Sequence, residues 1–250
     1  MEENEIKTKI IQNKNEAISV LDKYLDSCLL SDKKHIKKAN LLSYWLKDYT
    51  KYIELEESFN SSLLKEYSRG DVIKVNLGFN VGNEAGGLHY CIVLDKKNAK
   101  SYSTLTVVPL TSLKETSKKN STSVFLGNEL HNAILNKVQN ILNSIDKENA
   151  INYQRKVEKN LDANRVVEKI TVEERQALKD FNEKYPLIEK ILEEVKQMKK
   201  GSIALINQIT TISKQRIYNP KKNLDILSGV KISDEKMKLI DEKIKKLFIN

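Results

Sequence analysis

The sequence is poor in the residues that build disulfide frameworks, metal centres and membrane spans. Its two cysteines, Cys28 and Cys91, lie in different segments without metal-ligand spacing, so no disulfide is expected and a reducing cytoplasm is the default. The three histidines, His35, His89 and His131, are too scattered to predict a metal site, and no cofactor is expected. No stretch approaches the ~20 apolar residues of a membrane helix, and the acidic start is unlike a secretory signal.

Glycine is also scarce, and its distribution is uneven. Three of the eight glycines fall within six residues of the segment 80–89, which lies between two strand-like runs. Glycine allows sharp turns and a close approach of a ligand to the backbone. Glu84 and His89 place a carboxylate and an imidazole beside these glycines. We therefore expect this loop to form one side of any active site.

The positive charge is concentrated in two segments. The chain has 43 Lys and Arg against 34 Asp and Glu, and a net charge of +9. Segments 67–127 and 200–232 together carry 14 basic residues against 5 acidic ones, so the rest of the chain is balanced. Concentrated positive charge is typical of a protein that binds a polyanion. A surface that is merely solubilising remains an alternative.

Residues 1–66 have the periodicity of helices. Apolar residues at spacings of three, four and seven share one helical face: Ile6, Ile10, Ala17, Leu21, Tyr24 and Cys28. Ser31 and Asp32 are positioned to cap a second helix. The short polar link predicts an antiparallel hairpin whose apolar stripe packs into a core, with a partner helix or a membrane as the alternative.

From residue 67 the period changes to that of strands. Strand-like runs occupy 71–77, 90–94, 102–110, 121–126, 202–206 and 209–212. The first four runs follow one another too closely for helical crossovers. They should therefore pair antiparallel, as a meander or a small barrel.

A helical block separates the fourth and fifth of these runs. Thr171 begins a capping box there, and Pro186 is expected to end or kink a helix. We therefore expect an α+β architecture with a helical domain over 1–66 and a barrel domain over 67–250, which includes a helical insertion over 128–199 and a C-terminal helix over 233–249.

Four blocks in the two strand-rich segments resemble the MazF/PemK toxins, in the same order along the chain. These blocks lie at 69–73, 81–87, 107–112 and 206–216. Arg-Gly-Asp alone carries no information, whereas four ordered blocks are fairly specific, although they cover under half of the chain. The resemblance implies an SH3-like barrel, usually dimeric, that cleaves single-stranded RNA at short sequences without a metal. It also implies an antitoxin partner that occupies the RNA groove.

The resemblance extends to individual residues. Glu84 matches the glutamate of the family's first loop, and Thr111 matches its threonine at a strand end. The sequence departs from the family at His89-Tyr90, where members have Arg-Pro. Arginine stays protonated at any working pH, whereas histidine can exchange a proton near neutrality. We therefore predict His89 as a general acid or base, Glu84 as its counterpart and Thr111 as a phosphate ligand.

Each of these three residues also has a structural interpretation. His89 can fill a strand end, Glu84 can cap the glycine turn, and Thr111 can be an ordinary strand residue. His131 is expected to be solvated at a helix start. RNA contacts are expected from Asn83, Gly86, Gly87, Arg69, Ser112, Gln208, Lys214 and Arg216.

Among the expected RNA contacts, Arg69, Lys214 and Arg216 are candidates to replace the missing arginine charge. Gln208 can read a base edge or complete a β-ladder. A non-catalytic toxin or regulator on the same scaffold, binding nucleic acid or protein as CcdB-type relatives do, is the competing function. The helical parts are predicted to cover the groove or to build an oligomer interface.

Overall fold

The computed structural model describes residues 3–113, 121–162 and 170–249. The chain divides into two compact units. One comprises Met1–Ser58 with Gly78–Gly82, and the other comprises Phe59–Leu77 with Asn83–Asn250. The division expected at residue 66 stays a prediction about domains, and the two units are described separately below.

The first unit is built from α1 (Glu3–Leu29) and α2 (Lys33–Glu54). The carboxylate of Asp32 accepts hydrogen bonds from the backbone N–H groups of Lys34 and His35 at 2.9 and 3.0 Å. Asp32 therefore satisfies donors that the start of a helix leaves without partners. The predicted cap of the second helix is confirmed.

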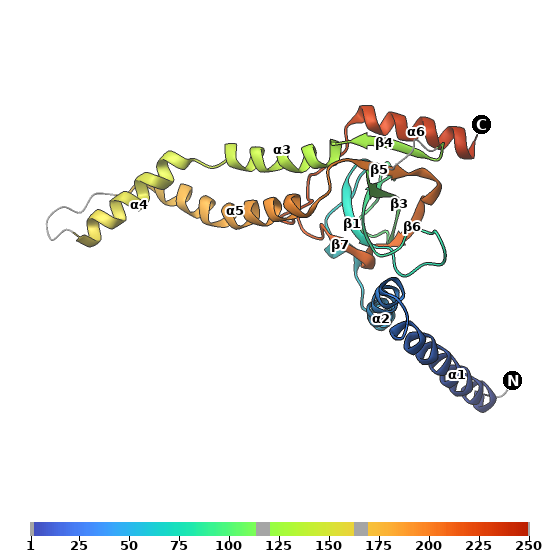
Figure 1. Cartoon of the computed structure of the whole chain (residues 1–250). Helices are drawn as coiled ribbons and strands as arrows, with labels where there is room; N and C mark the ends of the chain where they lie inside the picture. Colours follow the sequence, from blue (N-terminus) through green and yellow to red (C-terminus); the bar gives the residue numbers. More distant parts are fainter. Residues whose placement is uncertain (1–2, 114–120, 163–169, 250) are drawn as a thin grey trace. The chain divides into compact units, whose positions relative to one another are not determined.

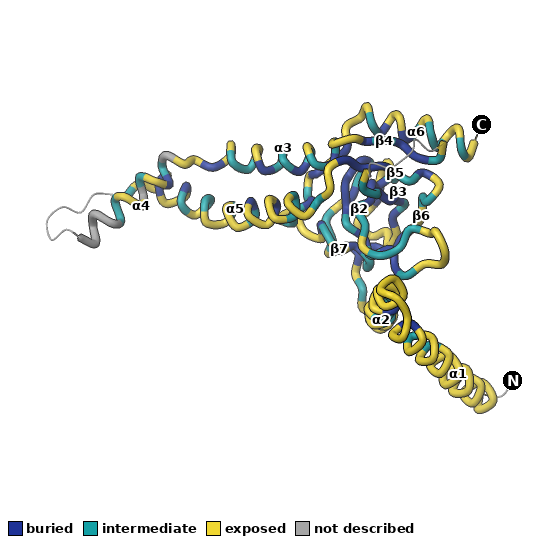
Figure 2. The backbone as a smooth tube through the Cα atoms, in the orientation of Figure 1, coloured by how far each residue is buried: buried dark blue, intermediate teal, exposed yellow. Residues whose placement is uncertain are grey.

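The apolar stripes of α1 and α2 are mostly exposed, as Figure 2 shows. Cys28 and Ala39, on either side of the link between the helices, are the buried residues of the pair. Figure 1 draws α2 nearly end-on while α1 runs across the view, so the helices do not lie antiparallel. The expected packed hairpin is wrong, because the helices meet near their link and bury little beyond it.

The second unit contains one antiparallel sheet. Its strands are β1 (Val72–Asn76), β2 (Leu88–Val93), β3 (Thr104–Ser112), β4 (Ser123–Gly127), β5 (Ser202–Leu205), β6 (Thr210–Ser213) and β7 (Ile217–Asn219). Their order is β4-β5-β3-β2-β1-β7, and β6 pairs with β3. Every pairing is antiparallel, as the close spacing of the runs predicts.

The long strand β3 is shared by two parts of this sheet. Residues 104–107 pair with β6, whereas residues 110–112 pair with β5. The short strand β7 pairs with β1, and no strand pairing within the described ranges joins β7 to β4 or β6. The sheet is therefore open, so the antiparallel arrangement is confirmed but the closed SH3-like barrel is not.

Alternate residues of the strands fill two cores. Ile92 belongs to a cluster that also includes residues of α3, α5 and α6. Its neighbour Cys91 belongs to a second cluster, with Tyr67 and Ile212. Successive side chains of a strand point to opposite faces, so both faces of β2 are covered. Each fully buried aliphatic side chain contributes roughly 1.5–3 kcal/mol to this packing.

The predicted insertion is helical and lies between β4 and β5. It consists of α3 (Glu129–Asn143), α4 (Lys147–Asp162) and α5 (Val172–Gln197), and α6 (Asp234–Phe248) follows the last strand. Figure 1 shows α3 and α5 running side by side away from the sheet, and buried residues of both helices belong to one cluster. No described helix has an apolar stretch long enough to cross a bilayer.

Helix α5 begins and continues for identifiable reasons. The Thr171 hydroxyl accepts from the Glu174 N–H at 3.2 Å, and the Glu174 carboxylate accepts from the Thr171 N–H at 3.0 Å, which confirms the capping box. Pro186 was expected to end or kink a helix, and it does not end one, because α5 runs through it. Pro186 and Asn182 are both exposed, so water can bind the carbonyl that proline leaves without a donor.

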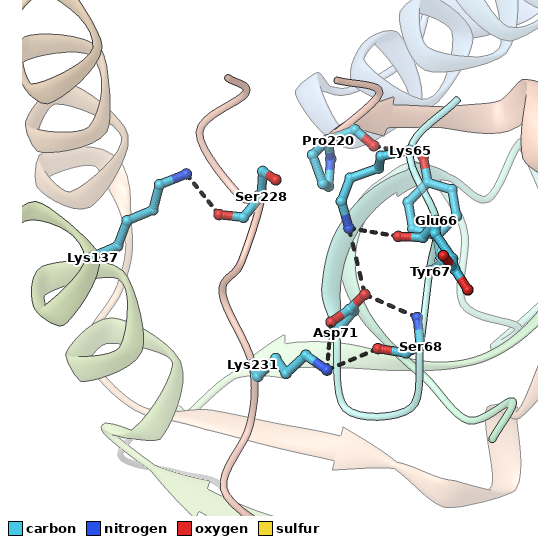
Figure 3. A network of polar contacts seen from close by, with 9 residues as sticks. All are labelled: Lys65, Glu66, Tyr67, Ser68, Asp71, Lys137, Pro220, Ser228 and Lys231. Carbon is cyan, nitrogen blue, oxygen red and sulfur yellow. Dashed lines mark hydrogen bonds and ion pairs between the residues drawn. The ribbon is translucent and has the colours of Figure 1, made fainter. Parts of the chain in front are cut away.

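The aspartate of the Arg-Gly-Asp block has a structural role, which Figure 3 shows. The Asp71 carboxylate accepts from the Ser68 N–H at 2.9 Å and pairs with Lys65 at 3.5 Å and Lys231 at 3.4 Å. Lys231 also donates to the Ser68 hydroxyl at 2.8 Å. These contacts tie the turn before β1 to the segment that precedes α6.

Candidate active site

A pocket of about 350 Å³ lies where strands β1, β2, β3 and β5 meet the first turn of α3 and the last turn of α5. This volume is typical of small-ligand sites. The polar residues that line it include Lys74, His89, Tyr90, Thr111, Ser112, His131, Glu194 and Ser202. No group of three or more metal-ligating side chains comes together in the described ranges.

His89 has a defined orientation in this pocket. It lies on β2 opposite Val75, is half-buried, and its Nδ1 is 2.9 Å from the carbonyl oxygen of Leu110 on β3. A carbonyl can only accept, so Nδ1 carries the hydrogen. In the neutral ring Nε2 therefore has the free lone pair and can accept a proton.

Thr111 and Ser112 end strand β3 and line the same pocket, next to the carbonyl that holds His89. They pair with Ile203 and Ser202 of β5, and both are half-buried. The structure therefore brings together three residues that the sequence predicts for one site.

A half-buried ion pair forms another wall of the pocket. One carboxylate oxygen of Glu194, on α5, accepts hydrogen bonds from Lys74 Nζ at 2.6 Å and from the Tyr90 hydroxyl. Lys74 and Tyr90 are cross-strand neighbours on β1 and β2, and the ammonium lies 5.2 Å from the centre of the Tyr90 ring. Strands and insertion are thus joined inside the pocket.

The charges in this wall follow from its contacts. Burial by itself raises the pKa of Glu194, but the hydrogen bonds from Lys74 and Tyr90 and the lysine charge outweigh it, so the pKa is lowered overall. Burial raises the pKa of the Tyr90 phenol, and the hydrogen bond to Glu194 and its charge raise it further. At neutral pH the pocket therefore holds a carboxylate and a neutral phenol.

Two of the predicted RNA-binding cations lie outside the pocket lining. Arg69 donates to the carbonyl of Leu94 at 2.6 Å and forms an ion pair with Asp241 of α6. Arg216 donates through Nε to the carbonyl of Asn76 at 2.8 Å. Both guanidinium groups therefore connect parts of the second unit.

Lys214 is buried, with 1% of its surface exposed, so it does not present the accessible charge that its expected RNA contact requires. Its ammonium donates to the carbonyls of Ala99 at 3.0 Å and Lys100 at 3.4 Å, which holds the link between β2 and β3. Burial lowers the pKa of this ammonium. Lys74 supplies positive charge inside the pocket instead.

The glycine-rich loop is held by Gln208. Its side-chain oxygen accepts from the Ala85 N–H at 3.0 Å, and its nitrogen donates to the Asn83 carbonyl at 3.4 Å. Gly87 has φ +83°, a conformation that favours glycine, and Gly86 beside it is half-buried. Glu84 is exposed on this loop and is not among the residues that line the pocket.

Four pocket residues were missed by the sequence analysis as site residues: Lys74, Tyr90, His131 and Glu194. Lys74 carries a signal, because it is the one charged residue of β1 and lies between apolar neighbours. Glu194 and His131 carry none, since they belong to helices far along the chain from the glycine loop.

One segment of the chain is similar to a known protein family. Residues 68–171 match the family model of PemK-like, MazF-like toxins of type II toxin–antitoxin systems. The resemblance stated from the four sequence blocks is confirmed for this segment, which contains His89, Thr111 and His131. The match covers fewer than half of the 250 residues. No curated protein matches the chain.

Proposed function

We propose that the protein is a metal-independent endoribonuclease that cleaves single-stranded RNA at short sequences. Members of the matched family are typically endoribonucleases. The observation that carries the proposal is His89, whose Nδ1 is held by Leu110 and whose Nε2 can act as a base in a pocket lined by Thr111 and Ser112. Imidazole exchanges protons near neutral pH, as this chemistry requires.

In the proposed reaction, His89 takes the proton from a ribose 2′-hydroxyl. The 2′-oxygen then forms a bond to phosphorus while the bond from phosphorus to the 5′-oxygen breaks. The products are a 2′,3′-cyclic phosphate and a 5′-hydroxyl, so the departing oxygen must gain a proton. Thr111 and Ser112 donate hydrogen bonds to the charge that grows on the phosphate. Glu84 stays a predicted counterpart of His89, from the neighbouring loop.

Substrate binding has to compete with Glu194. The Lys74 ammonium already donates to that carboxylate at 2.6 Å, and an RNA phosphate seeks the same donor. Glu194 and Gln197 of α5 line the pocket, as does Met198 directly after the helix, which supports the prediction that a helical part covers the groove. We also propose that the protein forms a homodimer and is located in the cytoplasm. An antitoxin is proposed to bind this groove.

The test is incubation of the purified protein with single-stranded RNA in EDTA. We expect fragments that end in cyclic phosphate, and a fall of about 10²–10⁴-fold in kcat for His89→Ala. The matched control is His35→Ala, because His35 is exposed on α2 and bonds Asp32. RNA that stays intact while the folded protein binds RNA, DNA or a protein favours the non-catalytic alternative.

A further inference from the structure

The pocket contains a second imidazole, which comes from the helical insertion. His131 is the third residue of α3, is half-buried, and lines the pocket together with His89. No hydrogen bond to its ring is found within the part of the chain that the structure describes. His131 lies at a helix start, as expected, and the structure adds that it is half-buried in the pocket lining.

The first turn of α3 is fixed in place by its neighbours. Leu130 is 3% exposed and belongs to the core between the helices and the sheet. The Glu129 carboxylate accepts from the Ser233 N–H, at the start of α6, at 2.9 Å. His131 is thus presented to the pocket by the two residues that precede it, both of which are anchored.

We propose that His131 is the general acid of the cleavage reaction, so that the insertion completes the catalytic site. This inference rests on the proposed ribonuclease function. As His89 removes the 2′-proton, the His131 imidazolium gives its proton to the departing 5′-oxygen. The phosphorus–oxygen bond breaks, a 5′-hydroxyl leaves, and His131 becomes neutral. Water then returns a proton to His131 and removes one from His89.

The contacts decide which histidine takes which role. His89 donates through Nδ1 to Leu110, which leaves Nε2 as an acceptor, as a base requires. His131 has no such partner among the described residues, so either N–H of its cationic ring is available to a leaving group. One imidazole cannot remove and supply a proton in the same step, and both rings line the same pocket of about 350 Å³.

The other acidic candidates in or near the pocket are less suited to this role. The Glu194 carboxylate is held by Lys74 and Tyr90, which lower its pKa overall and keep it charged. The Tyr90 phenol has a raised pKa and already donates to Glu194. Glu84 lies on the exposed loop, outside the pocket lining.

The first test compares His131→Ala and His131→Asn with the wild-type protein and with His35→Ala. We expect both His131 variants to lose about 10²–10⁴-fold in kcat on ordinary RNA, while His35→Ala is unchanged. A general acid must be protonated, so the wild-type rate should fall on the alkaline side of the pH profile. That alkaline limb should flatten in the His131 variants and persist in His89→Ala.

The second test changes the leaving group. An RNA with sulfur in place of the 5′-oxygen at the cleaved position releases a thiolate, which needs no proton because a thiol has a pKa of only about 8.5. On this RNA we expect His131→Ala to come within about 10-fold of the wild-type rate, whereas His89→Ala stays impaired. Thermal unfolding of each variant verifies that the fold is intact.

Each result decides between the two proposals. If the wild-type protein cleaves RNA and His131→Ala cleaves ordinary RNA equally well, the role of His131 is overturned and the ribonuclease stands. If His131→Ala loses the same factor on both substrates, His131 has a structural role and the inference fails. If the wild-type protein cleaves no RNA, both proposals fail together.

Discussion

At the scale of single residues, the most informative side chain is Glu194. One of its oxygens accepts from both Lys74 and Tyr90, so a residue of the insertion is bonded to two strands. Its pKa is lowered overall, which means that folding favours the charged carboxylate. A group of this kind contributes stability above its unfolded pKa, and the contribution is lost as pH falls through the folded pKa.

Replacing Glu194 with glutamine should therefore lower stability in a pH-dependent way. We expect Glu194→Gln to reduce the free energy of unfolding by ~1–3 kcal/mol at pH 7, because a hydrogen bond to a charged group is lost. The difference from wild type should shrink as pH falls below about 4.5. Urea unfolding at pH 7 and pH 3 measures this difference in the free energy of unfolding. The control is Glu193→Gln, because Glu193 is exposed. An equal difference at both pH values contradicts the role of the charge.

At the scale of elements, short sequence patterns predicted the helix caps and the strands, but they did not predict how far α5 extends. The caps at Asp32 and Thr171 and the strands of the sheet were predictable, because they depend on neighbours in sequence. The continuation of α5 through Pro186 was not predictable from sequence, because its flanking turns pack on α3, α4 and the sheet. That packing offsets the hydrogen bond that proline removes.

Replacing Pro186 with alanine should stabilise the second unit. Proline in a helix interior costs ~3 kcal/mol relative to alanine. Proline also restricts the unfolded chain, which stabilises the folded state by only about 0.4–1 kcal/mol. The difference between these two terms predicts a net gain of about 2 kcal/mol for Pro186→Ala, read from urea unfolding. Exposed Glu189→Ala, one turn away, is the control. A destabilised Pro186→Ala shows that the proline geometry itself is needed.

At the scale of the whole molecule, the second unit has two cores of its own among the residues that the structure describes. Their buried residues begin at Tyr67 and continue to Ile240. The pocket is likewise lined only by residues between Lys74 and Ser202. The second unit therefore has the contacts it needs for its own stability and for the proposed chemistry.

Removal of residues 1–58 should leave the second unit folded and its RNA cleavage unchanged. Thermal unfolding followed by circular dichroism should give a cooperative transition within a few degrees of that of the full chain. Cleavage rates on the same RNA, measured in parallel, check the site. Loss of the transition, or a change of 10-fold or more in rate, shows that α1 and α2 contribute to the second unit or its groove.

The antiparallel strand set and the helix caps were predictable from the residues, since they depend on periodicity and on motifs in short segments. The family resemblance predicted that His89 and Thr111 belong to one site, and both line one pocket. Tertiary structure alone decided that Lys214 is buried, that the sheet stays open, and that His131 and Glu194 reach the pocket. The physical reason is separation along the chain. A residue on a helix far from the strands enters the site only through packing that no local pattern records.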